Sequence, residues 1–227
     1  MKPVLAIKIG KLKLKNPVMV ASGTWGEEYG ELSDVSKLGA IVAKTITLKA
    51  RTGNPPPRVA EAAAGMLNSI GLENKGVDDF LAHKLPKLER FGVPVIVSIA
   101  GEEERELAEL ARKVKRAAAI ELNLSCPNVK HGSRAGLIAQ DAEATAAMVA
   151  AVRQASALPL IAKLTPNVTD IASIASAAES AGADAVLVAN TLLGMAVDIR
   201  TARPMLGNTC GGYSGPAVKP IIVRMVW

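Results

Sequence analysis

Apolar runs and amphipathic segments alternate along most of this chain. The apolar runs, each bounded by glycine, proline or polar residues, are typical of buried strands, and the segments between them have apolar residues at helical spacing. The predicted strands are 17–22, 40–45, 93–98, 118–125, 159–164 and 185–191. The predicted helices are 29–38, 77–91, 102–116, 141–155, 169–181 and a last helix that Pro216 opens. Ahead of them, alternating apolar and basic residues around Gly10 predict a β-hairpin over residues 5–16.

The six predicted strands have no polar face, which is typical of parallel strands covered by helices. A doubly wound sheet and a (β/α)₈ TIM barrel both satisfy this pattern. The barrel is favoured because polar residues gather at the carboxyl ends of the strands and no G-x-G-x-x-G follows the first one. We therefore expect an α/β barrel that forms a single domain over residues 1–227. Since a barrel needs eight strands, we also expect it to be incomplete, with strands seven and eight missing.

Two stretches interrupt the alternation. Residues 51–74 are predicted to be a long irregular excursion, and residues 207–215 are rich in glycine. Loops of such length in compact domains are usually functional or disordered. The glycines at 211, 212 and 215 have two interpretations, a flexible loop or a backbone that must approach a flat ring closely.

Composition and charge narrow the function classes. Hydrophobic residues make up 49% of the chain and aromatic residues 3%, as in a packed α/β protein. No apolar run approaches the roughly 20 residues of a membrane span, and the first residues do not resemble a signal peptide, so we expect a cytoplasmic protein. The two cysteines fit a reducing compartment and have no metal-ligand spacing. The net charge is +6, but the basic residues are scattered and lack interleaved aromatics, so nucleic-acid binding is not expected.

The stretch best suited to chemistry is 123–132, Asn-Leu-Ser-Cys-Pro-Asn-Val-Lys-His-Gly, at the end of the fourth predicted strand. A lone cysteine is often just a small buried residue, but Cys126 has polar neighbours on both sides. Other strand ends add further polar side chains, namely Ser22, Lys44, Thr45, Ser98, Lys163, Asn190 and Thr191. A strand-end asparagine can simply cap a turn. Together, however, lysines and carboxamides without a carboxylate suit an anionic, planar ligand rich in hydrogen-bonding groups.

Asn-Leu-Ser-Cys-Pro-Asn-Val-Lys-x-Gly resembles the active-site segment of the class 1 dihydroorotate dehydrogenases, in particular the class 1B catalytic subunit, and the resemblance covers nearly the whole chain. It implies FMN-dependent oxidation of dihydroorotate to orotate in pyrimidine biosynthesis, with Cys126 as the general base. The implied flavin contacts are Ser22, Lys44, Thr45, Ser98, Asn123, Lys163, Ala189 and Gly215. The implied substrate contacts are Lys44, Asn68, Ser69, Ile70, Gly71, Leu72, Asn123, Asn128, Asn190 and Thr191.

The resemblance also implies a partner subunit, and this chain differs from the family pattern at two places. Class 1B enzymes pass electrons to NAD through a second subunit that carries FAD and a 2Fe-2S cluster, which two cysteines in this chain cannot ligate. A homodimeric core is expected in the full-length protein. The family typically has Asn where this chain has Ser98, and residues 131–134 depart from the usual glycine pair.

Two alternatives stay open. A dihydropyrimidine dehydrogenase-like subunit would share the fold, the FMN and a similar cysteine motif. A truncated, non-catalytic remnant is the other, because the flavin phosphate in such barrels usually sits on the loops after strands seven and eight. On that ground we expect the 227-residue chain to bind FMN poorly or not at all.

Overall fold

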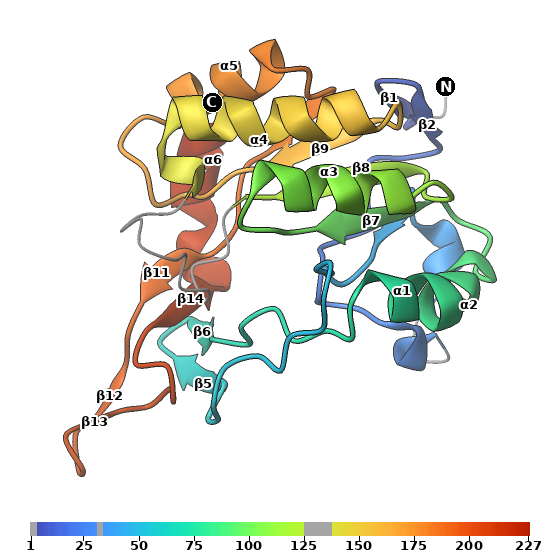
Figure 1. Ribbon diagram of the computed structural model, residues 1–227. Coiled ribbons are helices and arrows are strands. Elements are labelled where there is room, and N and C mark those ends of the chain that lie inside the picture. The colour runs from blue at the N-terminus through green and yellow to red at the C-terminus, as the bar shows by residue number, and fades with distance from the viewer. Residues whose placement is uncertain (1–3, 31–33, 125–137) are drawn as a thin grey trace.

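The computed structural model describes residues 4–30, 34–124 and 138–227. The centre of the fold is a parallel sheet (Figure 1). The sheet has six strands in the order β10-β9-β8-β7-β4-β3, and every neighbouring pair is parallel. Its strands are β3 (Met19–Val20), β4 (Ala40–Val42), β7 (Val95–Ile99), β8 (Ala119–Asn123), β9 (Leu160–Lys163) and β10 (Ala185–Leu187). A parallel strand thus lies within each of the six predicted ranges, and the sheet forms an open half-barrel with β3 and β10 at its edges.

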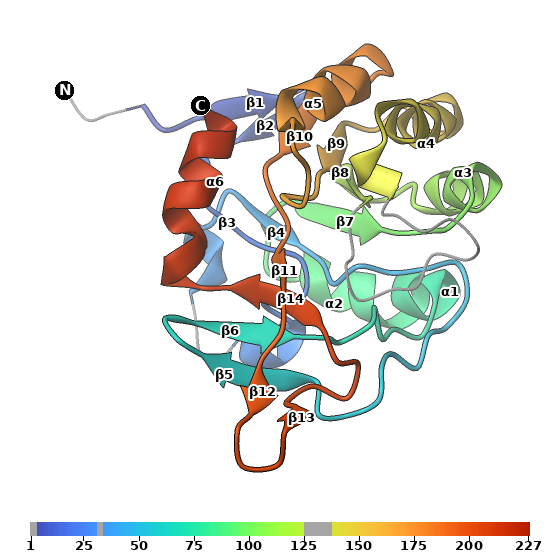
Figure 2. The ribbon, with the colours of Figure 1, turned by 90° about the vertical axis from the view of Figure 1, so that its left-hand side faces the viewer.

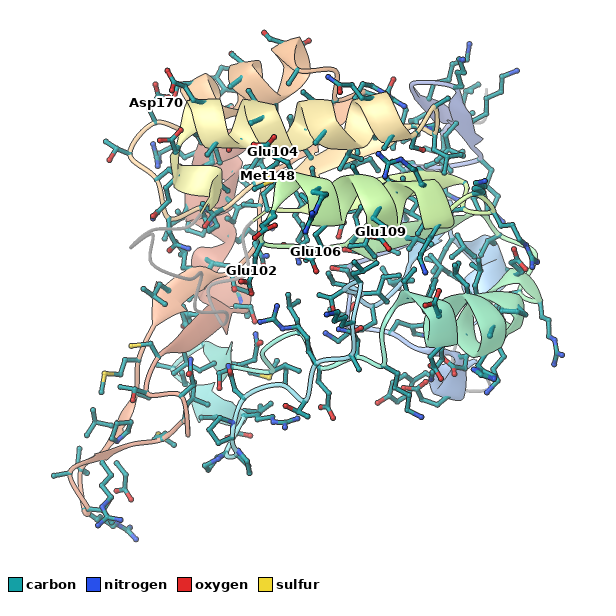
Figure 3. All side chains as sticks on the ribbon, in the orientation of Figure 1. Glu102, Glu104, Glu106, Glu109, Met148 and Asp170 are labelled. Atoms are coloured by element: carbon teal, nitrogen blue, oxygen red, sulfur yellow. The ribbon has the colours of Figure 1, made fainter. Side chains whose placement is uncertain are left out.

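Helices cover the outer face of this sheet (Figure 2). They are α1 (Val77–Asp79), the π-helix Phe80–Lys84, α2 (Leu85–Glu89), α3 (Glu104–Lys113), α4 (Ala142–Ala155) and α5 (Ile171–Ser180). A 3-10 turn, Pro216–Val218, leads into α6 (Lys219–Val226). Asp141 and Asp170 accept backbone N–H groups at the starts of α4 and α5, as N-caps do. Figure 3 shows the acidic side chains Glu104, Glu106 and Glu109 along α3, and Glu102 just before the helix.

The inner face of the sheet is closed at its amino end by the predicted hairpin, β1 (Ile7–Ile9) and β2 (Leu12–Leu14). Leu14 is buried in a cluster with residues near the starts of the parallel strands, which are Ala40, Val42, Ile96, Ala119 and Ile161. Gly10, at the hairpin turn, has φ +53°, and a Cβ there would lie 2.5 Å from Asp184 Oδ1. The turn therefore needs glycine for its backbone and for its close approach to Asp184.

A second, antiparallel sheet lies at the carboxyl end of the parallel strands (Figure 1, Figure 2). Its order is β11-β14-β6-β5, formed by β5 (Val59–Ala62), β6 (Gly65–Asn68), β11 (Leu192–Gly194) and β14 (Gly211–Ser214). A ribbon of β12 (Val197–Asp198) and β13 (Arg203–Pro204) projects from it. The prediction that 51–74 is irregular was therefore wrong, and of the two interpretations of the glycines in 207–215 the flexible loop does not hold for Gly211 and Gly212, because the two excursions pair with each other through β6 and β14.

Two further predictions need correction. The described residues of 29–38 form no α-helix; 3-10 helices lie at Glu27–Tyr29 and Val35–Lys37. Asp34 has a non-helical backbone and its carboxylate accepts the Ser36 hydroxyl, a local bond that competes with helix formation. The last parallel strand ends at Leu187 instead of Thr191, because the chain turns there toward β11.

Candidate active site

The inner face of the parallel sheet changes from apolar to polar toward the carboxyl ends of its strands. In β8, Ala119 belongs to the buried apolar layer, and Glu121 and Asn123 follow it on the same face. The strand register places Ser98 of β7 beside Glu121, and Lys163 of β9 beside Asn123. Side chains from three adjacent strands therefore meet in one polar layer above the apolar one.

Hydrogen bonds join this layer to the loops that follow the strands. The Thr45 and Ser98 hydroxyls are 2.9 Å apart, and the Ser98 hydroxyl donates to Glu121 Oε1 at 2.7 Å. The Asn123 amide donates to Thr45 Oγ1 at 3.2 Å, and the Asn190 amide donates to Asn123 Oδ1 at 3.3 Å. Four residues predicted to contact flavin or substrate are thus linked side chain to side chain.

Lys163 and Glu121 form a buried ion pair within the layer. The Lys163 ammonium donates to Ser22 Oγ at 2.9 Å and lies 3.7 Å from Glu121 Oε1. The two side chains are only 8% and 1% exposed, and a buried charge is tolerated when it is paired and hydrogen-bonded. Through Ser22, Lys163 also joins the segment that follows the edge strand β3 to the centre of the sheet.

Glu121 corrects the expectation that the site has no carboxylate. Glu121 lies inside an apolar run, between Ile120 and Leu122, and all three residues are buried. The sequence of this segment therefore resembles that of a strand buried on both faces. The available signal was its spacing of two residues from Asn123, which places both side chains on the same face of a strand.

The antiparallel sheet brings the predicted substrate residues to the same place. The Asn68 amide donates to the Gly212 carbonyl of β14 at 3.4 Å. A Cβ on Gly212 would lie 2.0 Å from Thr191 Oγ1, so glycine is required for Thr191 to pack there. The Thr191 N–H donates to Asn190 Oδ1 at 2.9 Å, which connects this group to the polar layer. The glycine-rich segment is therefore a strand whose small residues admit neighbouring side chains.

Two asparagines that the sequence analysis did not single out hold these segments. Asn167 donates to the Thr191 carbonyl at 3.2 Å and accepts the Leu193 N–H at 2.8 Å. Asn74 donates to the Leu72 carbonyl at 2.7 Å and to Thr47 Oγ1 at 2.9 Å. Both lie in loops after the strand ends, and a loop asparagine in a sequence does not reveal which segment it bonds.

The segment after Asn68 is held in an unusual backbone conformation. Gly71 and Leu72 have φ +74° and +55°, and the Ile70 carbonyl accepts the Asn54 N–H at 3.1 Å. Ser69 is fully buried, and its hydroxyl has no hydrogen-bond partner among the described residues. A buried hydroxyl without a partner costs free energy and is a feature that a bound ligand can relieve.

The other predicted contacts are more dispersed. Lys44 is half-buried, its alkyl chain lies against Gly23, and both line a cavity of about 420 Å³. Ala189 is half-buried beyond β10, and Gly215, with φ +122°, packs against the turn of the β5–β6 hairpin at Gly65. Cys126 and Asn128 lie outside the described residues.

The donors and acceptors present fit the polar ring system of a flavin. Such a ring offers alternating carbonyl and N–H groups, and the layer presents an ammonium, hydroxyls and carboxamides of both polarities. In the described part of the chain, no group of three or more His, Cys, Asp or Glu side chains is arranged to hold a metal ion. None of the helices in that part is both long and apolar enough to cross a membrane.

Comparison with known proteins gives the family. The profile described as Dihydroorotate dehydrogenase matches residues 4–227. The catalytic subunit of dihydroorotate dehydrogenase B (NAD(+)) from Desulforudis audaxviator is 54% identical, over 100% of this chain and 75% of that protein. The corresponding subunit from Listeria welshimeri is 50% identical, over 98% of this chain and 74% of that protein. In fold, the chain resembles a crystal structure of DHODH from Eimeria tenella in complex with ferulenol, with a TM-score of 0.77 and 24% identity over 99% of this chain and 69% of that one. This chain belongs to the dihydroorotate dehydrogenase family.

Proposed function

We propose that this chain catalyses the FMN-dependent oxidation of dihydroorotate to orotate in pyrimidine biosynthesis, as the catalytic subunit of an NAD-linked, class 1B enzyme. The names of relatives about half identical to it support this activity. The observation that carries the proposal is the polar layer, in which predicted flavin and substrate contacts from separate strands share one hydrogen-bonded network.

Each group of residues has a distinct task in this proposal. Ser22, Thr45, Ser98, Asn123 and Lys163 would hold the flavin ring, with Lys163 kept in place by Ser22 and Glu121. Ala189 and Gly215 would offer backbone contacts to it. Bound FMN supplies the acceptor for the hydride that leaves the substrate.

The substrate would be oriented by a second set of side chains. Lys44 offers a positive charge for its carboxylate, and the carboxamides of Asn68, Asn128 and Asn190 offer donors and acceptors for its ring. The Ser69–Leu72 segment and Thr191 would close around it. Cys126 would remove the proton beside the substrate carbonyl, which a thiolate does best when it is shielded from water and near a positive charge.

The proposal includes a partner subunit. The relatives are named as catalytic subunits, which supports a separate partner subunit. We propose that this partner carries FAD and a 2Fe-2S cluster and delivers the electrons to NAD, and that two copies of the catalytic subunit form the core of the assembly. The cytoplasmic location expected from the sequence stays a prediction.

A flavin-bleaching experiment tests the activity against its alternatives. The purified chain is mixed without oxygen with FMN in excess, because weak binding is expected, and then with dihydroorotate or with dihydrouracil. Bleaching of the flavin by dihydroorotate alone is expected. Equal bleaching by dihydrouracil favours a dihydropyrimidine dehydrogenase-like subunit, and bound flavin that neither compound bleaches favours a non-catalytic protein. A chain that binds no FMN at any concentration tested contradicts the proposed activity of this chain.

A further inference from the structure

Glu121 is the most deeply buried charged group of the polar layer, and the proposed function gives it no contact with flavin or substrate. Its side chain is 1% exposed, and its Oε1 accepts the Ser98 hydroxyl at 2.7 Å while lying 3.7 Å from Lys163 Nζ. Packing does not require a carboxylate at this position, because burying one costs free energy that its partners only offset.

The hydrogen bonds of the layer run in one direction and end on Glu121. Asn190 donates to Asn123, and Asn123 donates to Thr45. An ionised carboxylate can only accept, so the Ser98 proton points at Glu121. Ser98 has no second proton, so the Thr45 hydroxyl is the donor in its 2.9 Å contact with Ser98. Every proton in this chain of four hydrogen bonds therefore points toward the carboxylate.

We infer that Glu121 is a positioning residue that fixes the direction of the Thr45 and Ser98 hydrogen bonds in this chain and holds the Lys163 ammonium beside it. The Thr191 N–H donates to Asn190 Oδ1, which orients Asn190 and, through it, Asn123 from the other end of the chain. Glu121 orients the two hydroxyls in between, because Ser98 must donate to it and Thr45 must then donate to Ser98. The layer therefore presents a fixed pattern to a ring whose carbonyl and N–H groups alternate. The inference rests on the proposed function, since it takes the flavin ring and the cyclic substrate amide as the ligands that hydrogen-bond to this layer.

Glutamine at position 121 is the most informative change because it keeps the shape and removes the two properties that matter. Its amide group can donate to Ser98, which permits the Ser98 and Thr45 hydroxyls to turn around, and it has no charge opposite Lys163. Glu121→Asp is the conservative partner variant, because it keeps an acceptor that is charged but is one methylene shorter.

The experiment titrates FMN into the full 227-residue chain and its variants and follows flavin fluorescence and the absorbance spectrum of the bound flavin. We expect Glu121→Gln to weaken FMN binding by about 10- to 100-fold, the effect of losing one hydrogen bond to a charged group. We also expect it to shift the bound spectrum, and Glu121→Asp to restore part of the affinity. In a Thr45→Val background, which already interrupts the chain, Glu121→Gln should add little.

Asp184→Asn is the matched control. Asp184 also combines an ion pair with a hydrogen bond, to Arg153 at 3.1 Å and from the Leu160 N–H at 2.8 Å, but it lies at the amino end of the sheet. This variant should lose stability and yet keep FMN affinity and spectrum within about twofold of the parent, since a twofold change is only about 0.4 kcal/mol.

The possible results separate the inference from the proposed function. Parental FMN affinity in Glu121→Gln, or an effect that adds in full to that of Thr45→Val, overturns the inference. So does an equal loss of affinity in Asp184→Asn, which would make the effect one of general stability. If Glu121→Gln does not fold, the FMN affinity of Glu121→Asp is compared in the same way with that of the parent, of Thr45→Val and of Asp184→Asn. A parent chain that binds no FMN contradicts the proposed function itself and removes the inference with it.

Discussion

Replacing Gly10 with alanine tests how firmly the β1–β2 hairpin closes the amino end of the parallel sheet. At φ +53°, a side chain other than glycine costs about 1–2 kcal/mol in backbone strain. The new Cβ would also lie 2.5 Å from Asp184 Oδ1 and 2.7 Å from its Cγ, so the carboxylate must move. That movement breaks its hydrogen bond from the Leu160 N–H and its ion pair with Arg153.

The size of the effect follows from these contacts. A hydrogen bond to a charged group contributes about 1.5–3 kcal/mol, and the Arg153–Asp184 pair, more than a quarter exposed on each side, adds at most about 1 kcal/mol. Alanine lowers the entropy of the unfolded chain, which returns about 0.4–1 kcal/mol. We therefore expect Gly10→Ala to lower the free energy of unfolding by about 2–5 kcal/mol.

Gly92→Ala provides the control for backbone strain alone. Gly92 has φ +68°, and a Cβ there would meet nothing within 4 Å. After the same return of unfolded-chain entropy, it should cost only about 0–1.5 kcal/mol. Urea unfolding followed by circular dichroism measures both variants, and unchanged m-values would show that the two-state comparison is sound. Equal losses in the two variants would refute the reasoning, because they would mean that the Asp184 contact does not hold the hairpin.

Three other predictions concern the site and its surroundings. Cys126→Ala should slow dihydroorotate-dependent bleaching by about 10²- to 10⁴-fold and leave FMN affinity intact, and a near-parental rate would exclude Cys126 as the base. Gly212→Ala, whose Cβ would lie 2.0 Å from Thr191 Oγ1, should lower stability by about 1–3 kcal/mol and weaken orotate binding in a calorimetric titration; parental binding would separate β14 from the substrate site. Burial opposes ionisation of Glu27, but the hydrogen bond and charge of Lys84 outweigh it and lower the pKa of Glu27. Lys84→Met should therefore destabilise the protein at neutral pH, and its difference from the parent should disappear as the pH falls through that lowered pKa; a difference in urea unfolding that persisted in acid would contradict the pairing.

The parallel sheet could be predicted because each of its strands has a local sequence signal, an apolar run with distinct flanking residues. The run 159–164, for example, is apolar except for Lys163 and begins at a proline, and β9 occupies Leu160–Lys163. The polar strand ends could be predicted to converge for the same reason, since parallel strands present their carboxyl ends at one edge. The contacts among Ser22, Lys163 and Asn123 are consistent with that expectation.

The antiparallel sheet could not be predicted because no local sequence pattern indicates which segments pair. Asn68 and Gly212 face each other across 144 residues of sequence, in strands of four residues each. Their pairing is decided by which segments the parallel sheet brings together. Glu121 was missed for a related reason: the alternation that defines its face is hidden by apolar neighbours on both sides.

The register of β8 has a consequence for folding fidelity. A slip of one residue against β9 would turn Glu121 out of the polar layer and into the apolar cluster that holds Ile120 and Leu122. The carboxylate would then be buried without Lys163 or Ser98, at a cost of several kcal/mol, whereas a slip of purely apolar strands would cost little. The buried pair therefore penalises misaligned sheets, so that side chains of the proposed site also select the correct alignment of the strands that carry them.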